Sequence, residues 1–374
     1  MKIKSAVLRE MGAEYPYAKT KPIHIESLKL DPPGREEVLI QIKAASLCHS
    51  DLSVINGSRP RTLPMALGHE ASGIVKEVGE GITDLEPGDH IVCVFVPSCG
   101  HCVPCQEGRP ALCEPGARSN EAGTLINGDI RLHSEKESVN HHLGVSAFSD
   151  YTVVSRNSLV KVDKDIPFEH LALFGCAVIT GIGAVVNTAN ITLGSTVAII
   201  GLGGVGLSAL LGAVSAGASN IIAVDLNETK LMQARELGAT DTFNSNDPDV
   251  VEAIRQATEG GLDYVFETAG AVSAMEVAYR ITKRGGTTVT TGLPHPDDHF
   301  SFPYVSLTVE EKTLKGSYVG SCVPSRDIPR FISLFKQGRL PVDKLHSGTI
   351  ALNDINEGFD KLAGGEASRI VIRM

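Results

Sequence analysis

The sequence predicts an α/β protein of two domains, one mostly antiparallel β and the other a doubly wound parallel sheet. The first observation is size, since 374 residues with 42% hydrophobic side chains are enough for two cores. The second is a set of short β-branched segments between glycine and proline turns in the first half, such as 36–46. The third is an alternation of strand and helix patterns over 179–320. We therefore expect a first domain over 1–178, an inserted parallel domain over 179–320, and a return to the first domain over 321–374.

The charge balance excludes some classes of partner. The chain carries 44 acidic against 34 basic residues, a net charge of −10, and has no lysine or arginine run. This balance argues against nucleic acid. Residues 1–18 lack the apolar stretch of a signal peptide, and the longest apolar run, 197–202, is too short to cross a bilayer. We expect a cytoplasmic protein that binds neither nucleic acid nor membrane.

Three residues far apart in the first domain make a possible metal site. Cys48 and His69 lie on either side of a turn-rich segment, and Cys176 follows an apolar run and precedes a small-residue helix. Each alone is most simply a packed side chain. Together, two cysteines and a histidine are the ligand set of a catalytic zinc with one open position.

A second cysteine cluster lies on a lobe rich in glycine and proline. Its spacing is C-x2-C-x2-C-x7-C, formed by Cys99, Cys102, Cys105 and Cys113. Four thiolates enclose an ion tetrahedrally and leave no open position, so the spacing favours a structural zinc. An iron–sulfur cluster and a nucleic-acid-binding zinc module are the alternatives, and the acidic composition opposes the second.

The parallel domain begins with a phosphate-binding pattern. A β-branched strand over 197–200 leads into a G-x-G-x-x-G turn and a helix expected over 207–216, and the next strand ends at Asp225. The glycines permit a tight turn and close approach of a pyrophosphate, while an acid at the second strand takes ribose hydroxyls and repels a 2′-phosphate. The pattern therefore predicts NAD rather than NADP, bound by Gly201, Gly203, Gly204, Val205, Gly206 and Asp225. Further strands are expected at 220–225, 241–244, 263–270 and 286–292.

Four motifs in order carry a resemblance to a known family. They are GHEASGIVKEVGEGITDLEPGDHIV, the four-cysteine lobe, GLGGVGLSAL and INEGFDKLAGGEASRIVI, and they span the chain nearly end to end. The chain resembles the zinc-dependent alcohol dehydrogenases of the medium-chain dehydrogenase/reductase superfamily. The resemblance implies a GroES-like catalytic domain, a Rossmann NAD-binding domain, a cofactor cleft between them, and a homodimer or homotetramer.

The resemblance also assigns residues around a catalytic zinc. It gives Cys48, His69 and Cys176 as the ligands and places Glu70 behind the metal. Asp51 is expected to bond the other nitrogen of His69, as carboxylates often do next to a metal-binding histidine. Ser50 occupies the hydroxyl relay position, although a helix N-cap is its ordinary alternative.

Other residues are implied at the cofactor and the substrate. His49 and Arg369 fall where the family contacts the pyrophosphate, Thr180 near the nicotinamide, and Lys230 beside Asp225 at the adenosine ribose. Where some relatives end the proton path in a histidine, this chain has Ser53. One of His141 and His142 is expected to border the substrate pocket, as is Phe95.

The implied function is reversible hydride transfer between an alcohol and its aldehyde or ketone, with two zinc ions and NAD per chain. The alcohol ionises at the catalytic zinc and its proton leaves through Ser50. Two alternatives stay open. One is a dehydrogenase of thiol adducts, of the glutathione-dependent formaldehyde type, with Arg118 near the acidic end of the adduct. The other is a non-catalytic NAD-binding protein.

Overall fold

The structure is a computed structural model that describes all residues, 1–374, and the chain forms two compact units. The first unit holds Met1–Cys176, Val323–Arg330 and His346–Met374, and the second holds Ala177–Cys322 and Phe331–Leu345. The chain passes between the units four times: after Cys176, after Cys322, after Arg330 within helix α12 (Pro324–Lys336), and after Leu345.

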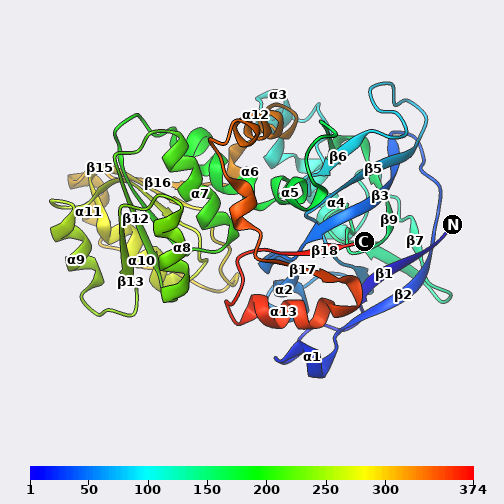
Figure 1. Cartoon of the computed structure of the whole chain (residues 1–374), viewed down its shortest axis with the longest axis horizontal. Coiled ribbons are helices and arrows are strands. Elements are labelled where there is room, and N and C mark those ends of the chain that lie inside the picture. The colour runs from blue at the N-terminus through cyan, green and yellow to red at the C-terminus, as the bar shows by residue number, and fades with distance from the viewer. The chain divides into compact units, whose positions relative to one another are not determined.

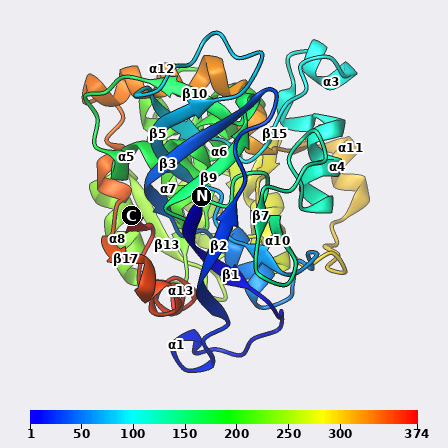
Figure 2. The same ribbon diagram turned by 90° about the vertical axis from the view of Figure 1, so that its right-hand side faces the viewer.

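The first unit is built on two sheets. Five strands close a small barrel in the order β1-β2-β7-β8-β4, and Figure 2 shows β1, β2 and β7 side by side. A second sheet runs β10-β6-β5-β3-β18-β17, with β9 paired to β3. The barrel strands are β1 (Lys2–Leu8), β2 (Ile23–Leu30), β4 (Met65–Ala66), β7 (Leu132–His133) and β8 (Ser138–His141). Those of the second sheet are β3 (Glu37–Ser46), β5 (Ala71–Val78), β6 (His90–Cys93), β9 (Tyr151–Ser155), β10 (Leu159–Val162), β17 (Gly348–Ala351) and β18 (Ile370–Arg373).

Strand β3 shows why the first unit folds as it does. Its sequence EVLIQIKAAS is β-branched and apolar, almost all of its residues are buried, and it pairs with β5, β9 and β18. Short helices join the strands: α1 (Tyr17–Thr20), α2 (His49–Ile55), α3 (Val103–Gln106), α4 (Glu114–Ala122), α5 (Phe168–Ala172) and α13 (Ile355–Ala363).

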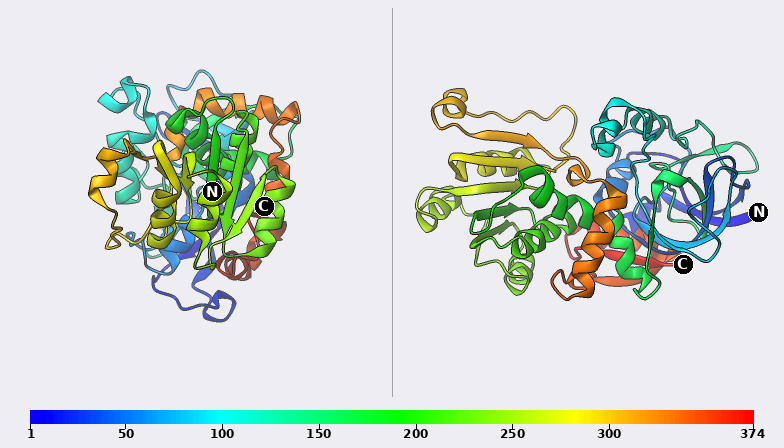
Figure 3. Two further views of the ribbon diagram at one scale, coloured as in Figure 1. Left: turned by 90° about the vertical axis from the view of Figure 1, so that its left-hand side faces the viewer. Right: turned by 90° about the horizontal axis from the view of Figure 1, so that it is seen from above.

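The second unit is a six-stranded parallel sheet in the order β13-β12-β11-β14-β15-β16. Figure 3 (left) shows its green and yellow strands with helices on both faces. The strand bounds are β11 (Thr196–Ile200), β12 (Asn220–Asp225), β13 (Asp241–Asn244), β14 (Leu262–Glu267), β15 (Thr282–Thr290) and β16 (Thr313–Gly316). The helices, labelled in Figure 1, are α6 (Ala177–Gly183), α7 (Gly204–Ser215), α8 (Glu228–Glu236), α9 (Val250–Ala257), α10 (Val272–Ile281) and α11 (Tyr304–Val309).

Three details differ from the expectations. Helix α7 begins at Gly204, three residues before the expected start, because the third glycine of the turn packs inside its first turn. The sequence analysis missed β16, an edge strand whose four residues are all exposed and therefore lack a strand-like apolar pattern. Residues 331–345, expected in the returning segment, belong to the second unit.

No single helix of the chain is long and apolar enough to cross a bilayer, although the bent pair Phe168–Gly175 and Ala177–Ala189 passes on length and composition together.

Candidate active site

Four buried polar side chains of the first unit converge on one point. Cys48 immediately precedes α2, His69 and Glu70 lie between β4 and β5, and Cys176 follows the short 3-10 turn Leu173–Gly175. One ligand atom from each lies within 4.8 Å of the others, and all four residues are buried. The three residues that the sequence offered as zinc ligands are therefore neighbours in space.

Two glycines allow the backbone to bring these residues together. Gly68, next to His69, has φ +94°, and a Cβ there would come within 2.5 Å of the Phe148 backbone nitrogen. Gly175, next to Cys176, packs so tightly against Cys93 that a Cβ would overlap its carbonyl oxygen. A larger residue at either position would shift the adjacent side chain, His69 or Cys176.

The electrostatics of this group suit a metal cation. The neighbouring Cys176 thiol lowers the pKa of Cys48 well below its usual value against the opposing effect of burial, and the charges of Arg369 and His69 add to the shift. The His69 Nε2 atom is buried and has no hydrogen-bond partner within the protein. A buried nitrogen of this kind is costly unless it is bound, and a zinc ion would satisfy it. The residues present therefore fit a zinc ion.

The other nitrogen of His69 faces Asp51 on α2. His69 Nδ1 lies 3.2 Å from Asp51 Oδ1, which also accepts a 3.1 Å hydrogen bond from the Gly68 backbone N–H. His142 approaches the same carboxylate, with Nδ1 3.0 Å from Oδ1. Asp51 is fully buried, so its charge depends on these polar neighbours; the Gly68 N–H and His69 form hydrogen bonds with it, whereas His142 Nδ1 approaches at 3.0 Å without forming one.

Glu70, a member of this group, also faces the buried guanidinium of Arg369. Arg369 Nη1 donates to the Leu47 carbonyl at 3.1 Å and lies 3.6 Å from Glu70 Oε2. Arg369 is 3% exposed and is thus a buried cation beside Glu70, while its expected contact with the cofactor pyrophosphate stays a prediction.

Helix α2 carries the two serines of the expected proton path. Ser50 Oγ lies 3.7 Å from Cys48 Sγ, which donates to it. The N-cap of α2 is Cys48, so Ser50 stands inside the first turn and is not the cap. Ser53 Oγ donates to the His49 carbonyl at 2.9 Å, and His49 itself is exposed. The hydroxyl of Ser50 therefore borders the ligand group, whereas that of Ser53 is bonded to backbone.

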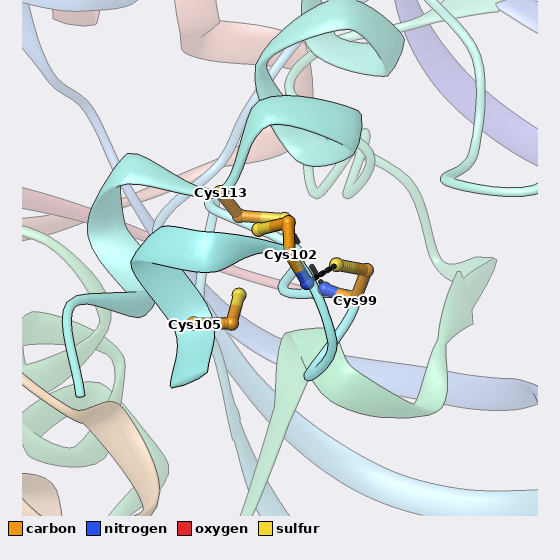
Figure 4. A group of neighbouring side chains, drawn as sticks. All are labelled: Cys99, Cys102, Cys105 and Cys113. Carbon is orange, nitrogen blue, oxygen red and sulfur yellow. Dashed lines mark hydrogen bonds between the residues drawn. The ribbon is translucent and has the colours of Figure 1, made fainter. Parts of the chain in front are cut away.

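The four cysteines of the second cluster, Cys99, Cys102, Cys105 and Cys113, also lie close together. Their sulfurs lie within 4.8 Å of one another, all four are free thiols, and Figure 4 shows them converging from α3 and its flanking turns. Backbone N–H groups donate to the sulfurs, from Cys102 to Cys99 at 3.3 Å and from Cys99 to Cys113 at 3.2 Å. Burial opposes ionisation of Cys102, but hydrogen bonds from backbone groups and neighbouring thiols lower its pKa to about 6. Such a set fits a tetrahedral zinc.

In the second unit the glycine turn between β11 and α7 is closely packed at Gly201 and Gly206 and open at Gly203. Gly201 has φ +88°, and a Cβ at Gly206 would overlap the Gly201 carbonyl oxygen, so both positions require glycine. A Cβ at Gly203 would meet nothing within 4 Å. Gly203 caps α7 without a side-chain bond, which leaves the first N–H groups of the helix for an anion. Gly204 and Val205 are the first two residues of α7.

Asp225, at the end of β12, is hydrogen-bonded to the backbone of this turn. Its Oδ2 accepts from the Leu202 N–H at 2.6 Å, and its Oδ1 accepts from the Asn227 N–H at 3.0 Å. The residue lines a cavity of about 160 Å³ with Gly201, Val224, Leu226, Ser245, Ala269, Ala271, Ser273, Ala274 and Val277. Lys230 lies in the first turn of α8 and Thr180 on α6, both half-buried.

The sequence analysis did not predict two features near these groups. Glu267, at the end of β14, is 2% exposed and accepts from the N–H groups of Ala269 and Gly270 and from Thr290 Oγ1. A carboxylate at the carboxyl end of a parallel strand was the available signal. The second is the contact of His142 with Asp51. Local sequence patterns do not predict it, because 91 residues separate the two positions.

Two family models match the chain. One, described as the alcohol dehydrogenase GroES-like domain, matches residues 34–164, and the other, described as zinc-binding dehydrogenase, matches residues 204–337.

Solved structures match it nearly end to end. An alcohol dehydrogenase zinc-binding domain protein from Burkholderia ambifaria is 35% identical, and benzyl alcohol dehydrogenase from Acinetobacter calcoaceticus is 34% identical. Each covers 100% of this chain and 99% of its own, with a TM-score of 0.93. A zinc-binding dehydrogenase from Sinorhizobium meliloti bound to NADP is 27% identical, with a TM-score of 0.82 and full coverage of both chains.

These comparisons confirm the expected fold class, a GroES-like domain with a Rossmann-type domain. They also confirm the resemblance drawn from the four sequence motifs. The chain belongs to the zinc-dependent alcohol dehydrogenases of the medium-chain dehydrogenase/reductase superfamily and is an oxidoreductase of that type.

Proposed function

We propose that the protein is a zinc- and NAD-dependent alcohol dehydrogenase that interconverts an alcohol with its aldehyde or ketone. The convergence of Cys48, His69 and Cys176 around a buried, unpartnered His69 Nε2 carries this proposal. A non-catalytic descendant has no need to keep such a costly arrangement. We place the reaction in the cytoplasm, where clustered cysteines stay reduced and available to metal.

Cys48, His69 and Cys176 would hold the catalytic zinc, which leaves one position for substrate. When bound, zinc supplies Lewis acidity toward the substrate oxygen. Asp51 holds the proton on His69 Nδ1, so that Nε2 faces the metal. Ser50 Oγ borders the ligand group and takes the proton of the alcohol outward. Glu70, beside Arg369, stands behind the ligands and assists their exchange.

A second zinc is proposed at Cys99, Cys102, Cys105 and Cys113. Four convergent sulfurs fill a tetrahedral shell and leave no position for substrate, so its role is to hold the lobe together. The N–H groups directed at the sulfurs would stabilise the thiolates.

We propose NAD as the physiological cofactor, bound at the turn 201–206. When bound there, the dinucleotide would supply the chemistry of hydride transfer, as NAD in alcohol oxidation and as NADH in the reverse direction. Asp225 would accept from the ribose hydroxyls, and its negative charge opposes a 2′-phosphate. The Sinorhizobium relative binds NADP, so this choice rests on Asp225 in particular. Lys230 would approach the ribose, while His49, Arg369 and Thr180 are the proposed contacts to pyrophosphate and nicotinamide.

Aromatic primary alcohols are the first substrates to test. The 34% identical Acinetobacter enzyme is a benzyl alcohol dehydrogenase. In this chain the Phe95 ring lies 5.3 Å from the His69 ring, centroid to centroid, so it lies beside the proposed metal.

We also propose that the enzyme is a homo-oligomer, a dimer or a tetramer. Strand β16 is an edge strand with exposed backbone, and the neighbouring helix α11 exposes Tyr304, Val305 and Val309 by more than half. An unpaired edge beside an apolar surface favours pairing with a second copy.

The test is formation of NADH by the purified protein with primary, secondary and aromatic alcohols, and separately with formaldehyde in the presence and absence of glutathione, because a thiol forms its adduct with an aldehyde and not with an alcohol. Turnover of a free alcohol without thiol supports the proposal. Turnover that requires the thiol supports the thiol-adduct alternative, for which exposed Arg118 on α4 was the candidate contact. No turnover of any alcohol, nor of formaldehyde with glutathione, contradicts both.

A further inference from the structure

The buried carboxylate of Asp51 faces two imidazoles rather than one. His69 Nδ1 lies 3.2 Å from it and His142 Nδ1 lies 3.0 Å from it. The exposed fractions are 0% for Asp51 and His69 and 1% for His142, so water does not compete for these contacts. The rings of His69 and His142 also pack edge to face, with centroids 5.4 Å apart.

The backbone that carries the His142 ring is held by its own hydrogen bonds. The residue directly follows β8, and its N–H donates both to the Ala66 carbonyl at 3.2 Å and to Ser146 Oγ at 3.1 Å. Its own carbonyl accepts from the Ser146 N–H at 3.2 Å. Leu143 and Ser146 both have positive φ, which closes this turn tightly. His142 is therefore held in place independently of Asp51.

A carboxylate with one partner can rotate about its side-chain torsion, whereas one held from several directions cannot. Asp51 Oδ1 accepts from Gly68 N–H, and the two imidazoles approach the same group from their own elements. These contacts restrain the carboxylate that His69 Nδ1 faces, at 3.2 Å from both of its oxygens, and with it the direction of His69 Nε2.

We propose that His142 is a positioning residue for the metal-binding histidine, acting through Asp51. The inference rests on the catalytic zinc of the proposed function. Groups that orient a metal-binding histidine are worth 10–100-fold in metal affinity when they contact it directly. Because His142 acts one residue further away, we expect an effect near the lower end, about tenfold.

The adjacent histidine provides a matched control. His141 is also fully buried, but its Nε2 accepts from the Arg131 backbone N–H at 3.1 Å, and it does not belong to the group around Asp51. Replacing His141 with leucine disturbs the same turn without removing a partner of Asp51.

The experiment compares wild type with His142→Leu, His142→Asn and His141→Leu. Asparagine keeps an N–H donor close to the position of the imidazole Nδ1, whereas leucine removes it. Loss of zinc to a chelator is followed over time, and the catalytic component is identified as the one missing in Cys176→Ser. The absorption spectrum of enzyme with cobalt in the catalytic site reports ligand geometry separately from turnover.

We expect His142→Leu to lose the catalytic zinc about tenfold faster and to shift the cobalt spectrum. His142→Asn should restore both readouts most of the way, and His141→Leu should lower thermal stability without changing either. Wild-type behaviour of His142→Leu overturns the inference, as does equal behaviour of the leucine and asparagine variants, or of the two leucine variants. If wild type holds no zinc that is missing in Cys176→Ser, the proposed function is contradicted instead, and this is seen before the histidine variants are compared.

Discussion

Two serines one helical turn apart on α2 have different surroundings. Ser50 Oγ contacts the Cys48 sulfur, whereas Ser53 Oγ is bonded to the His49 carbonyl. In the proposed mechanism, only the first hydroxyl would receive a proton from a substrate held at the cysteines and His69.

Ser50→Ala is therefore expected to lower kcat by about 10²-fold, the usual contribution of a positioned proton-transfer group. The zinc content should not change, since the serine is not a ligand. Steady-state kinetics with metal analysis of the same samples provides the measurement. Ser53→Ala is the matched control and should keep wild-type kcat; equal kcat for Ser50→Ala and wild type would remove Ser50 from the proton path.

The second residue of interest is Asp225, whose carboxylate both supports the glycine turn and faces the proposed ribose site. Asp225→Gly should lower the ratio of kcat/KM for NAD to that for NADP by at least about tenfold, or 1.4 kcal/mol, because the repulsion of a 2′-phosphate is gone. Binding of NAD should weaken as well, since Leu202 N–H loses its acceptor.

Kinetics with both cofactors checks this expectation. Asp241→Asn, an exposed acid on the neighbouring strand β13, is the control that removes the same charge elsewhere. Unchanged cofactor discrimination in Asp225→Gly would show that the carboxylate does not select NAD.

At the scale of elements, some parts could be predicted because a local pattern encodes them. Strands β11 to β14 follow from short strand-like runs, and the glycine turn from its G-x-G-x-x-G pattern, which the structure explains by positive φ at Gly201 and close packing at Gly206. Strand β16 and the contact between His142 and Asp51 could not be predicted. The first has no buried face, and the second depends on a turn that brings β8 against α2.

The four-cysteine lobe, with α3 and the start of α4, has few buried apolar residues of its own, because Val103 and Leu112 are exposed. Its order should depend on its metal. Cys113→Ser is expected to remove one zinc per chain and to cost about 2 kcal/mol, which lowers Tm by roughly 4–8 °C in a unit of this size.

Metal analysis and thermal unfolding test this. Cys93→Ala, at a buried cysteine of β6 outside both cysteine groups, should keep both zinc ions. Undiminished zinc in Cys113→Ser would mean that the lobe holds no structural metal.

For the whole molecule, oligomerisation through the β16 edge predicts that charge on α11 will separate the subunits. Val305→Glu combined with Val309→Glu places two carboxylates on the exposed apolar face of that helix. We expect light scattering to show a shift from an oligomer toward the mass of one chain. Met232→Glu, at an exposed methionine of α8, is the control; a wild-type monomer would contradict the proposal directly.

The central claim is that the group of Cys48, His69 and Cys176 holds the zinc that performs the chemistry. The most direct measurement is zinc per chain in wild type and in Cys176→Ser, combined with alcohol-dependent formation of NADH in the same samples. The account predicts two zinc ions in wild type, one in the variant, and loss of turnover with the missing ion. A variant that keeps two zinc ions, or that turns over alcohol with one, would contradict it.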